Sequence, residues 1–169
     1  MRTLVIMRHA KAESSAPTDH DRALTERGHT DATEAGSWLA ASGIAPDYAL
    51  VSAAVRTSET WEDLCVGAGW ELGLAESSEA LYSAEGETAL DLIRETEPGV
   101  VSLVVVGHNP TMGYLVQLLD DGDGDEDAMS QVAMGGYPTA AATVFTYDGD
   151  WSDLEEGAAT LVAFHVGQG

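Results

Sequence analysis

Two histidines and two arginines follow three apolar segments of this sequence, each where the segment ends. Arg8 and His9 follow the run 3–7, Arg56 comes shortly after the run 48–51, and Gly107 joins His108 to the run 100–106. Arginine forks bind phosphate oxygens in pairs and keep their charge at neutral pH. A neutral imidazole can attack phosphorus, and a second, protonated imidazole can stabilise the developing charge. The set therefore indicates phosphoryl chemistry, provided that the fold brings the three ends together.

Short apolar strands alternate with amphipathic helices along the chain. Strands are expected at residues 3–7, 48–51, 100–106, about 140–147 and about 159–166. Helices are expected at about 26–42, 53–67, 87–97 and 111–119, with Thr25 capping the first helix and Gly43 ending it. Residues 70–82 fit neither pattern, and residues 120–127 read as an acidic loop. This alternation predicts an α/β sheet covered on both faces, in which ligands bind beyond the carboxyl ends of the strands.

The charge of the 169-residue chain narrows the possible partners. Seven basic residues stand against 29 acidic ones, a net charge of −22, which argues against binding to nucleic acid or to an anionic membrane surface. Six of the basic residues lie within residues 1–56, and only Arg94 lies beyond them.

No apolar run reaches the roughly 20 residues of a membrane span, and no signal peptide is visible. With Cys65 as its single cysteine, the chain is expected to be cytoplasmic, and we expect a monomer.

Four segments, in order, resemble the motifs of the histidine phosphatase (phosphoglycerate-mutase-like) superfamily, in its small SixA-type phosphohistidine phosphatase branch. They are Met7-Arg8-His9-Ala10, residues 21–28 (DRALTERG), residues 52–60 (SAAVRTSET) and residues 106–110 (VGHNP). Ala10 replaces the glycine of the mutases, and residues 11–14 offer no counterpart to the asparagine and serine that follow there. The resemblance implies an α/β fold, a three-layer α/β/α sandwich with a mostly parallel central sheet and one antiparallel edge. It also implies one histidine phosphatase domain over residues 1–169.

The same resemblance assigns roles to the residues that match. It implies a metal-independent phosphohydrolase without a cofactor, which works through a phosphohistidine enzyme intermediate. His9 would be the nucleophile, and Arg8 and Arg56 would bind the non-bridging phosphoryl oxygens and neutralise their charge. His108 would donate a hydrogen bond to the phosphoryl group, and Asn109 is expected among the substrate-binding residues.

The sequence singles out no clear general acid to protonate the leaving group. Many relatives use a carboxylate, and Glu85 is the candidate by position, although the SixA-like branch manages without a dedicated acid. A phosphorylated histidine leaves as imidazole, which is easier to expel than an alkoxide. Asp21 and Arg22 are interpreted as a structural pair that fixes the loop after the first strand.

Three functions remain open. The favoured substrate is phosphohistidine on a partner protein, because only 32 residues separate the helix ending near residue 67 from the strand at Val100, too few to build a lid. A small-molecule phosphomonoesterase acting on a sugar, nucleotide or cofactor phosphate is the alternative. A catalytically inactive phosphate-dependent binding module is disfavoured, because such a module usually lacks the nucleophile.

Other motifs are expected to carry no chemistry. The acidic loop lacks the glycine and glutamate of a calcium-binding EF-hand loop at the required positions. Cys65 is expected to be a buried apolar residue inside a helix. His20, His29 and His165 are interpreted as surface or core histidines, and their spacing favours no metal site.

Overall fold

The computed structural model describes residues 1–169, and its six strands form one mixed sheet in the order β3-β2-β4-β1-β5-β6. Strands β3, β2, β4 and β1 run parallel, β5 is antiparallel to β1, and β6 is antiparallel to β5. The strands are β1 (Arg2–Arg8), β2 (Tyr48–Ser52), β3 (Ala75–Ser78), β4 (Ser102–Gly107), β5 (Ala141–Tyr147) and β6 (Thr160–Val166).

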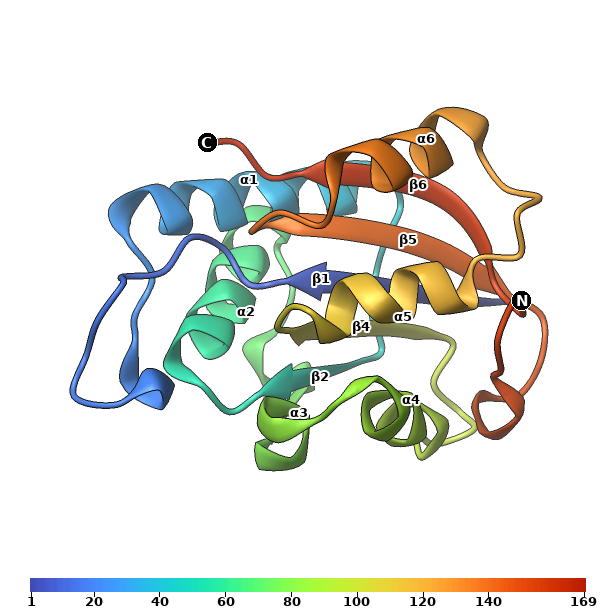
Figure 1. The fold of residues 1–169 in the computed structure, drawn as a ribbon, viewed down its shortest axis with the longest axis horizontal. Helices are drawn as coiled ribbons and strands as arrows, with labels where there is room; N and C mark the ends of the chain where they lie inside the picture. Colours follow the sequence, from blue (N-terminus) through green and yellow to red (C-terminus); the bar gives the residue numbers. More distant parts are fainter.

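Helices cover both faces of this sheet (Figure 1). They are α1 (Glu26–Ala41), α2 (Val55–Ala68), α3 (Glu79–Ser83), α4 (Gly86–Arg94), α5 (Thr111–Leu119) and α6 (Glu126–Gly135). Helices α1 and α2 pack on one face, whereas α3, α4, α5 and α6 contribute to the core on the other face. No helix is long and apolar enough to cross a membrane.

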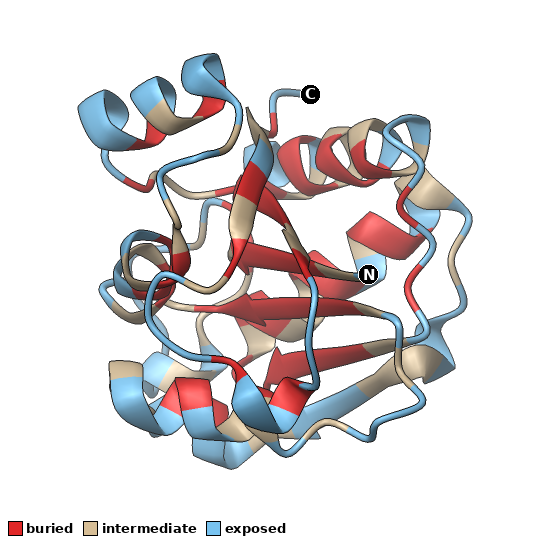
Figure 2. Cartoon of the chain, turned by 90° about the vertical axis from the view of Figure 1, so that its right-hand side faces the viewer, coloured by how far each residue is buried: buried red, intermediate tan, exposed pale blue.

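The alternation of side chains along β1 explains why the protein has two cores. Leu4 and Ile6 point into the core beneath α3–α6, whereas Val5 and Met7 point into the core beneath α1 and α2. All four side chains are fully buried. Figure 2 shows the buried strands between helices whose outer faces are exposed. A strand that is apolar at every position is what a sheet covered on both faces requires.

Helices α1 and α2 approach each other closely through two glycines. A Cβ atom on Gly36 would overlap the backbone of Leu64, and a Cβ atom on Gly67 would overlap the carbonyl oxygen of Thr33. This close packing fixes α2 against α1. It therefore also fixes Arg56, which lies in the first turn of α2.

The α/β sandwich with a mostly parallel sheet is confirmed. The expected strands and helices form, and Thr25 caps α1 by accepting a hydrogen bond from the Gly28 N–H. The antiparallel pairing lies at one edge of the sheet, where β5 pairs antiparallel with β1 and β6 pairs antiparallel with β5.

Two segments differ from the sequence-based expectation. Residues 70–82 contain a 3-10 helix, strand β3 and most of α3, and β3 is only four residues long, too short for a pattern to show. The acidic stretch ends in helix α6, where Asp125 caps the N-terminus by accepting from the Ala128 N–H. Acidic side chains in a first turn stabilise a helix, so Glu126 and Asp127 begin α6 instead of extending the loop.

Candidate active site

The residues predicted to carry the chemistry meet at the carboxyl edge of the parallel strands. Arg8 pairs in register with Gly107 of the neighbouring strand, and the His9 N–H donates to the Gly107 carbonyl over 3.0 Å. This register places His9 beside His108, with their ring centroids 5.4 Å apart. Arg56 reaches the same edge from the first turn of α2, and its charge acts on both imidazoles. The expected convergence of the three strand ends is therefore observed.

His9 is held in the form that a nucleophile needs. Its Nδ1–H donates to the carbonyl oxygen of Ala10 over 2.7 Å, which leaves a lone pair on Nε2. The residue is only 7% exposed. Burial lowers the pKa of His9 to about 4, helped by the charges of Arg56, Arg8 and Arg22, while the bond to Ala10 acts in the opposite direction. His9 is therefore neutral at neutral pH.

His108 presents a second neutral imidazole. Its Nε2 lies 2.7 Å from the hydroxyl oxygen of Ser52, which also accepts a hydrogen bond from the Ala54 N–H. A Ser52 hydroxyl that donates to Nε2 would leave the proton of neutral His108 on Nδ1. Burial, followed by the charge of Arg56, lowers the pKa of His108 to about 3. Burial and the nearby arginines therefore favour a neutral His108 in the free protein, and its hydrogen bond to the phosphoryl group stays a prediction.

The two arginines each use part of their guanidinium group to bind the protein. Arg8 Nη1 donates to the Tyr137 carbonyl over 3.2 Å. Arg56 Nη1 donates to the Asp19 carbonyl over 2.8 Å, and Nη2 donates to the Asp19 carboxylate over 3.1 Å. The Nε atoms of both arginines are buried and have no hydrogen-bond partner, and the same is true of His108 Nδ1. Three buried nitrogens without partners, on residues at the same edge of the sheet as His9, fit an anion with several oxygens.

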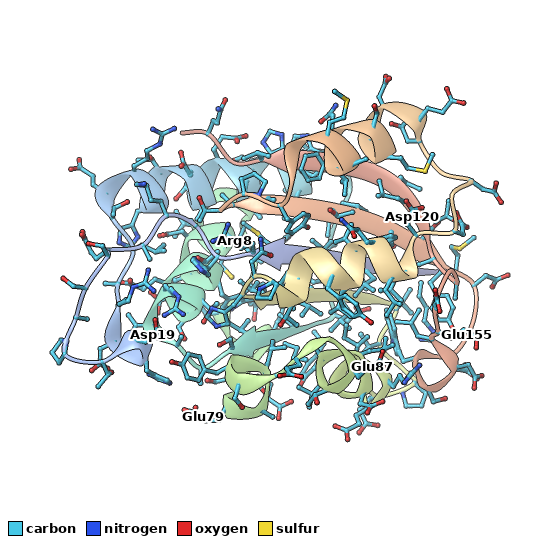
Figure 3. The ribbon with its side chains drawn as sticks, in the orientation of Figure 1. Arg8, Asp19, Glu79, Glu87, Asp120 and Glu155 are labelled. Atoms are coloured by element: carbon cyan, nitrogen blue, oxygen red, sulfur yellow. The ribbon has the colours of Figure 1, made fainter.

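Asp19 and Tyr82 complete the site, and neither was predicted from the sequence. The Tyr82 hydroxyl donates to the Asp19 carboxylate over 2.7 Å, and the Tyr82 ring packs edge-on against His108 with centroids 5.6 Å apart. In Figure 3, Asp19 lies on the same side of the molecule as Arg8, whereas Asp120 and Glu155 lie toward the opposite end. The only signal for Asp19 in the sequence is its place three residues before Arg22.

The predicted pairing of Asp21 with Arg22 is wrong. Arg22 forms an ion pair with Asp19 at 2.9 Å instead, and its Nε donates to the carbonyl oxygen of Glu13 over 2.7 Å. Asp19 and Arg22 are three residues apart around a short 3-10 helix (Asp19–Asp21), so their side chains lie on one side of it, and Asp21 is exposed. Arg22 still fixes the loop after β1, but with another partner.

Comparison with known proteins agrees with this geometry. Residues 4–81 match the sequence family described as the histidine phosphatase superfamily, branch 1. The phosphohistidine phosphatase SixA of Escherichia coli strain K12 is 32% identical over 123 residues, which cover 70% of this chain and 74% of that protein. A SixA-type structure from Nakamurella multipartitia superposes with a TM-score of 0.84 at 30% identity, covering 98% of this chain and 96% of that one. The protein histidine phosphatase SixA in complex with tungstate gives a TM-score of 0.77 at 25% identity, covering 97% and 96%.

The chain belongs to the histidine phosphatase superfamily. Its similarity to SixA proteins places it in the SixA-type branch and supports a phosphatase.

Asn109 of this histidine phosphatase binds other parts of the protein with both polar atoms of its side chain. Its Nδ2–H donates to the Tyr137 carbonyl over 2.7 Å, and its Oδ1 accepts from the Gly113 N–H over 3.1 Å. Tyr137 thereby links Asn109 to Arg8, because one carbonyl oxygen accepts from both side chains. These contacts give Asn109 a structural role, and its contact with substrate stays a prediction.

Glu85 lies beside a cavity instead of among the catalytic residues. It is exposed, precedes the first residue of α4, and lines a cavity of about 470 Å³ together with Gly86, Glu87, Thr88, Pro110 and Tyr114. Its side chain forms no hydrogen bond or ion pair with the two histidines or the two arginines. Its role as general acid therefore stays a prediction.

The remaining cysteine and histidines singled out in the sequence contact other parts of the protein and not the two histidines of the site. Cys65 is buried in α2, and burial raises the pKa of its thiol to about 11, as expected for an inert apolar residue. His29 lies 2.6 Å from a carboxylate oxygen of Asp63, and His165 lies 2.7 Å from one of Glu34. Nowhere in the chain do three His, Cys, Asp or Glu side chains form a group that could hold a metal ion.

Proposed function

We propose that this phosphatase removes the phosphoryl group from phosphohistidine on a partner protein, through a phosphohistidine intermediate on His9. The observation that carries the mechanism is the lone pair on His9 Nε2 beside three buried nitrogens that have no partner. These nitrogens belong to Arg8, Arg56 and His108, which lie at the same edge of the sheet as His9, and they are available to donate to phosphoryl oxygens.

The reaction has two steps. In the first step, His9 Nε2 forms a bond to phosphorus while the bond from phosphorus to the substrate imidazole breaks. The substrate imidazole leaves and takes up a proton. In the second step, water attacks the phosphorus of phosphorylated His9, and inorganic phosphate and neutral His9 are released.

The arginines and His108 act on the charge of the transferring group. Arg8 and Arg56 direct their Nε–H groups to non-bridging oxygens, and they do so from a buried site where such bonds are stronger than in water. The Nδ1–H of neutral His108 adds a third donor. A neutral His9 is ready to attack without first losing a proton, because its pKa lies far below 7.

Two observations support a protein as the substrate. The similar proteins include phosphohistidine phosphatase SixA from Escherichia coli and the protein histidine phosphatase SixA. Between α2 and β4 the chain forms only a 3-10 helix and the short elements β3, α3 and α4. This segment contributes one strand to the sheet and helices to the core, which leaves little chain for a lid over the site.

Trapping the intermediate tests the mechanism. Wild-type protein incubated with a histidine-phosphorylated phosphotransfer domain should become phosphorylated, with a bond that is labile in acid and stable in alkali. His9→Ala should form no phosphoenzyme and lose activity, whereas His165→Ala, which alters a histidine outside the site, should keep both. Full activity of His9→Ala, or loss of wild-type activity on adding EDTA, would overturn the mechanism.

Substrate preference is tested separately. We expect kcat/KM to be higher for the phosphorylated phosphotransfer domain than for sugar phosphates and nucleotides. A metabolite turned over a hundredfold more efficiently than the phosphoprotein would replace the proposed substrate with a small phosphate ester.

A further inference from the structure

Asp19 is the one carboxylate that forms ion pairs with the arginines around the nucleophile. Its Oδ1 accepts from Arg22 Nη1 at 2.9 Å, and its Oδ2 accepts from Arg56 Nη2 at 3.1 Å and from the Tyr82 hydroxyl at 2.7 Å. Its backbone carbonyl accepts from Arg56 Nη1 at 2.8 Å. These donors come from three segments of the chain, so Asp19 connects the loop after β1 to α2 and α3.

The contacts with Asp19 divide the guanidinium of Arg56 into two edges. Asp19 binds the end formed by Nη1 and Nη2, and Nε lies on the other edge without a partner. The Asp19 side chain is 54% exposed, whereas that of Arg56 is only 7% exposed. The carboxylate therefore lies on the solvent side of the guanidinium, and the unpartnered Nε is buried.

We propose that Asp19 is a positioning residue that directs the Nε edge of Arg56 toward the phosphoryl group of the substrate. This proposal rests on the proposed function, in which Arg56 binds phosphoryl oxygens. An arginine presents two parallel donors on its Nε edge, so rotation of the guanidinium would exchange that paired contact for a weaker one. Tyr82 supports the arrangement, because its hydroxyl binds the same carboxylate oxygen as Arg56.

Whether loss of the Asp19 charge strengthens or weakens anion binding distinguishes a positioning role from simple charge repulsion. A carboxylate near an anion site repels the anion, so removing its charge would by itself strengthen anion binding. If Asp19 positions Arg56, its removal should instead weaken anion binding and slow the reaction. Asp21 provides the matched control, because it is an exposed aspartate two residues away that forms no ion pair with an arginine.

The experiment compares Asp19→Asn, Tyr82→Phe and Asp21→Asn with the wild type. Tungstate affinity is measured by calorimetry at pH 7.5, and kcat and KM are measured with the phosphorylated phosphotransfer domain. We expect Asp19→Asn to weaken tungstate binding about tenfold and to lower kcat/KM by at least tenfold. Tyr82→Phe should have a smaller effect in the same direction, and Asp21→Asn should stay within twofold of the wild type.

Equal or tighter tungstate binding by Asp19→Asn would overturn the positioning role, and so would equal losses in Asp19→Asn and Asp21→Asn. Urea unfolding of each variant shows whether it is folded at the assay temperature. If Asp19→Asn does not fold, unchanged tungstate affinity in Tyr82→Phe would count against the proposal. A failure of the proposed function looks different, because wild-type protein would then form no phosphoenzyme although tungstate binding still responds to Asp19.

Discussion

Replacing His9 with asparagine should make the fold less sensitive to mild acid, even though it removes the proposed nucleophile. The pKa of a histidine in an unfolded chain is about 6.5, whereas burial and nearby arginines lower the pKa of His9 to about 4 in the folded protein. Between these two pH values the unfolded chain binds a proton that the folded protein does not. The free energy of unfolding therefore falls as the pH is lowered through 6.5 toward 4.

The size of the loss follows from the two pKa values. At pH 5 the unfolded histidine is almost fully protonated and the folded one is almost fully neutral, so the wild type loses about 2 kcal/mol relative to pH 7.5 through His9 alone. His9→Asn lacks this contribution. The pH dependence of the difference between the two proteins isolates His9, because the carboxylates that also titrate are present in both.

Urea unfolding at pH 7.5 and pH 5.0 measures this difference, and both values lie above the sequence pI of about 4.1. On going to pH 5.0, the wild type should lose about 2 kcal/mol more stability than His9→Asn. If the two losses agree within about 0.5 kcal/mol, His9 titrates near its ordinary pKa in the folded protein. The argument that burial keeps His9 neutral would then be refuted.

Two further predictions concern stability and use the same urea assay. Hydrogen bonding to Asp63 raises the pKa of His29, so its stabilisation is present below the unfolded pKa and is lost as the pH rises through the folded pKa. The stability advantage of the wild type over His29→Asn should therefore be larger at pH 6 than at pH 9, and a constant advantage would contradict the pairing. Gly67→Ala should lower the free energy of unfolding by about 2 kcal/mol, because its Cβ would push α1 away from α2. Gly73→Ala, where a Cβ meets no atom within 4 Å, should change it by less than about 0.5 kcal/mol, and equal effects would exclude the packing explanation.

The four central residues of the site could be found in the sequence because they lie at or shortly after the ends of apolar runs that form strands. Parallel strands bring their carboxyl ends to one edge, so the spatial convergence of His9, His108 and Arg56 follows from the element order alone. Only the residue types and the strand positions are needed for that step. The family motifs then assigned the nucleophile, which no spacing argument could have done.

The contacts of Asp19 could not be predicted in the same way. Its partners Arg56 and Tyr82 lie 37 and 63 residues away in the sequence, and the contacts depend on how an irregular loop folds back over α2. Apart from its place three residues before Arg22, nothing in the local sequence distinguishes Asp19 from Asp21. The lowered pKa of His108 likewise depends on burial and on the charge of Arg56, neither of which a local sequence pattern shows.

In this strongly acidic chain, the few arginines fall into two groups by what their side chains bind. Arg2 donates to the carbonyl oxygens of Gly149, Pro98 and Val100, and Arg94 donates to that of Leu154. These two arginines bind loop carbonyls away from the nucleophile.

Arg8, Arg22 and Arg56, by contrast, all lower the pKa of His9. Of the 29 acidic residues, only Asp19 forms ion pairs with any of these three arginines. The local charge around His9 is therefore positive although the chain carries −22, because three arginines lie near His9 and a single carboxylate pairs with two of them.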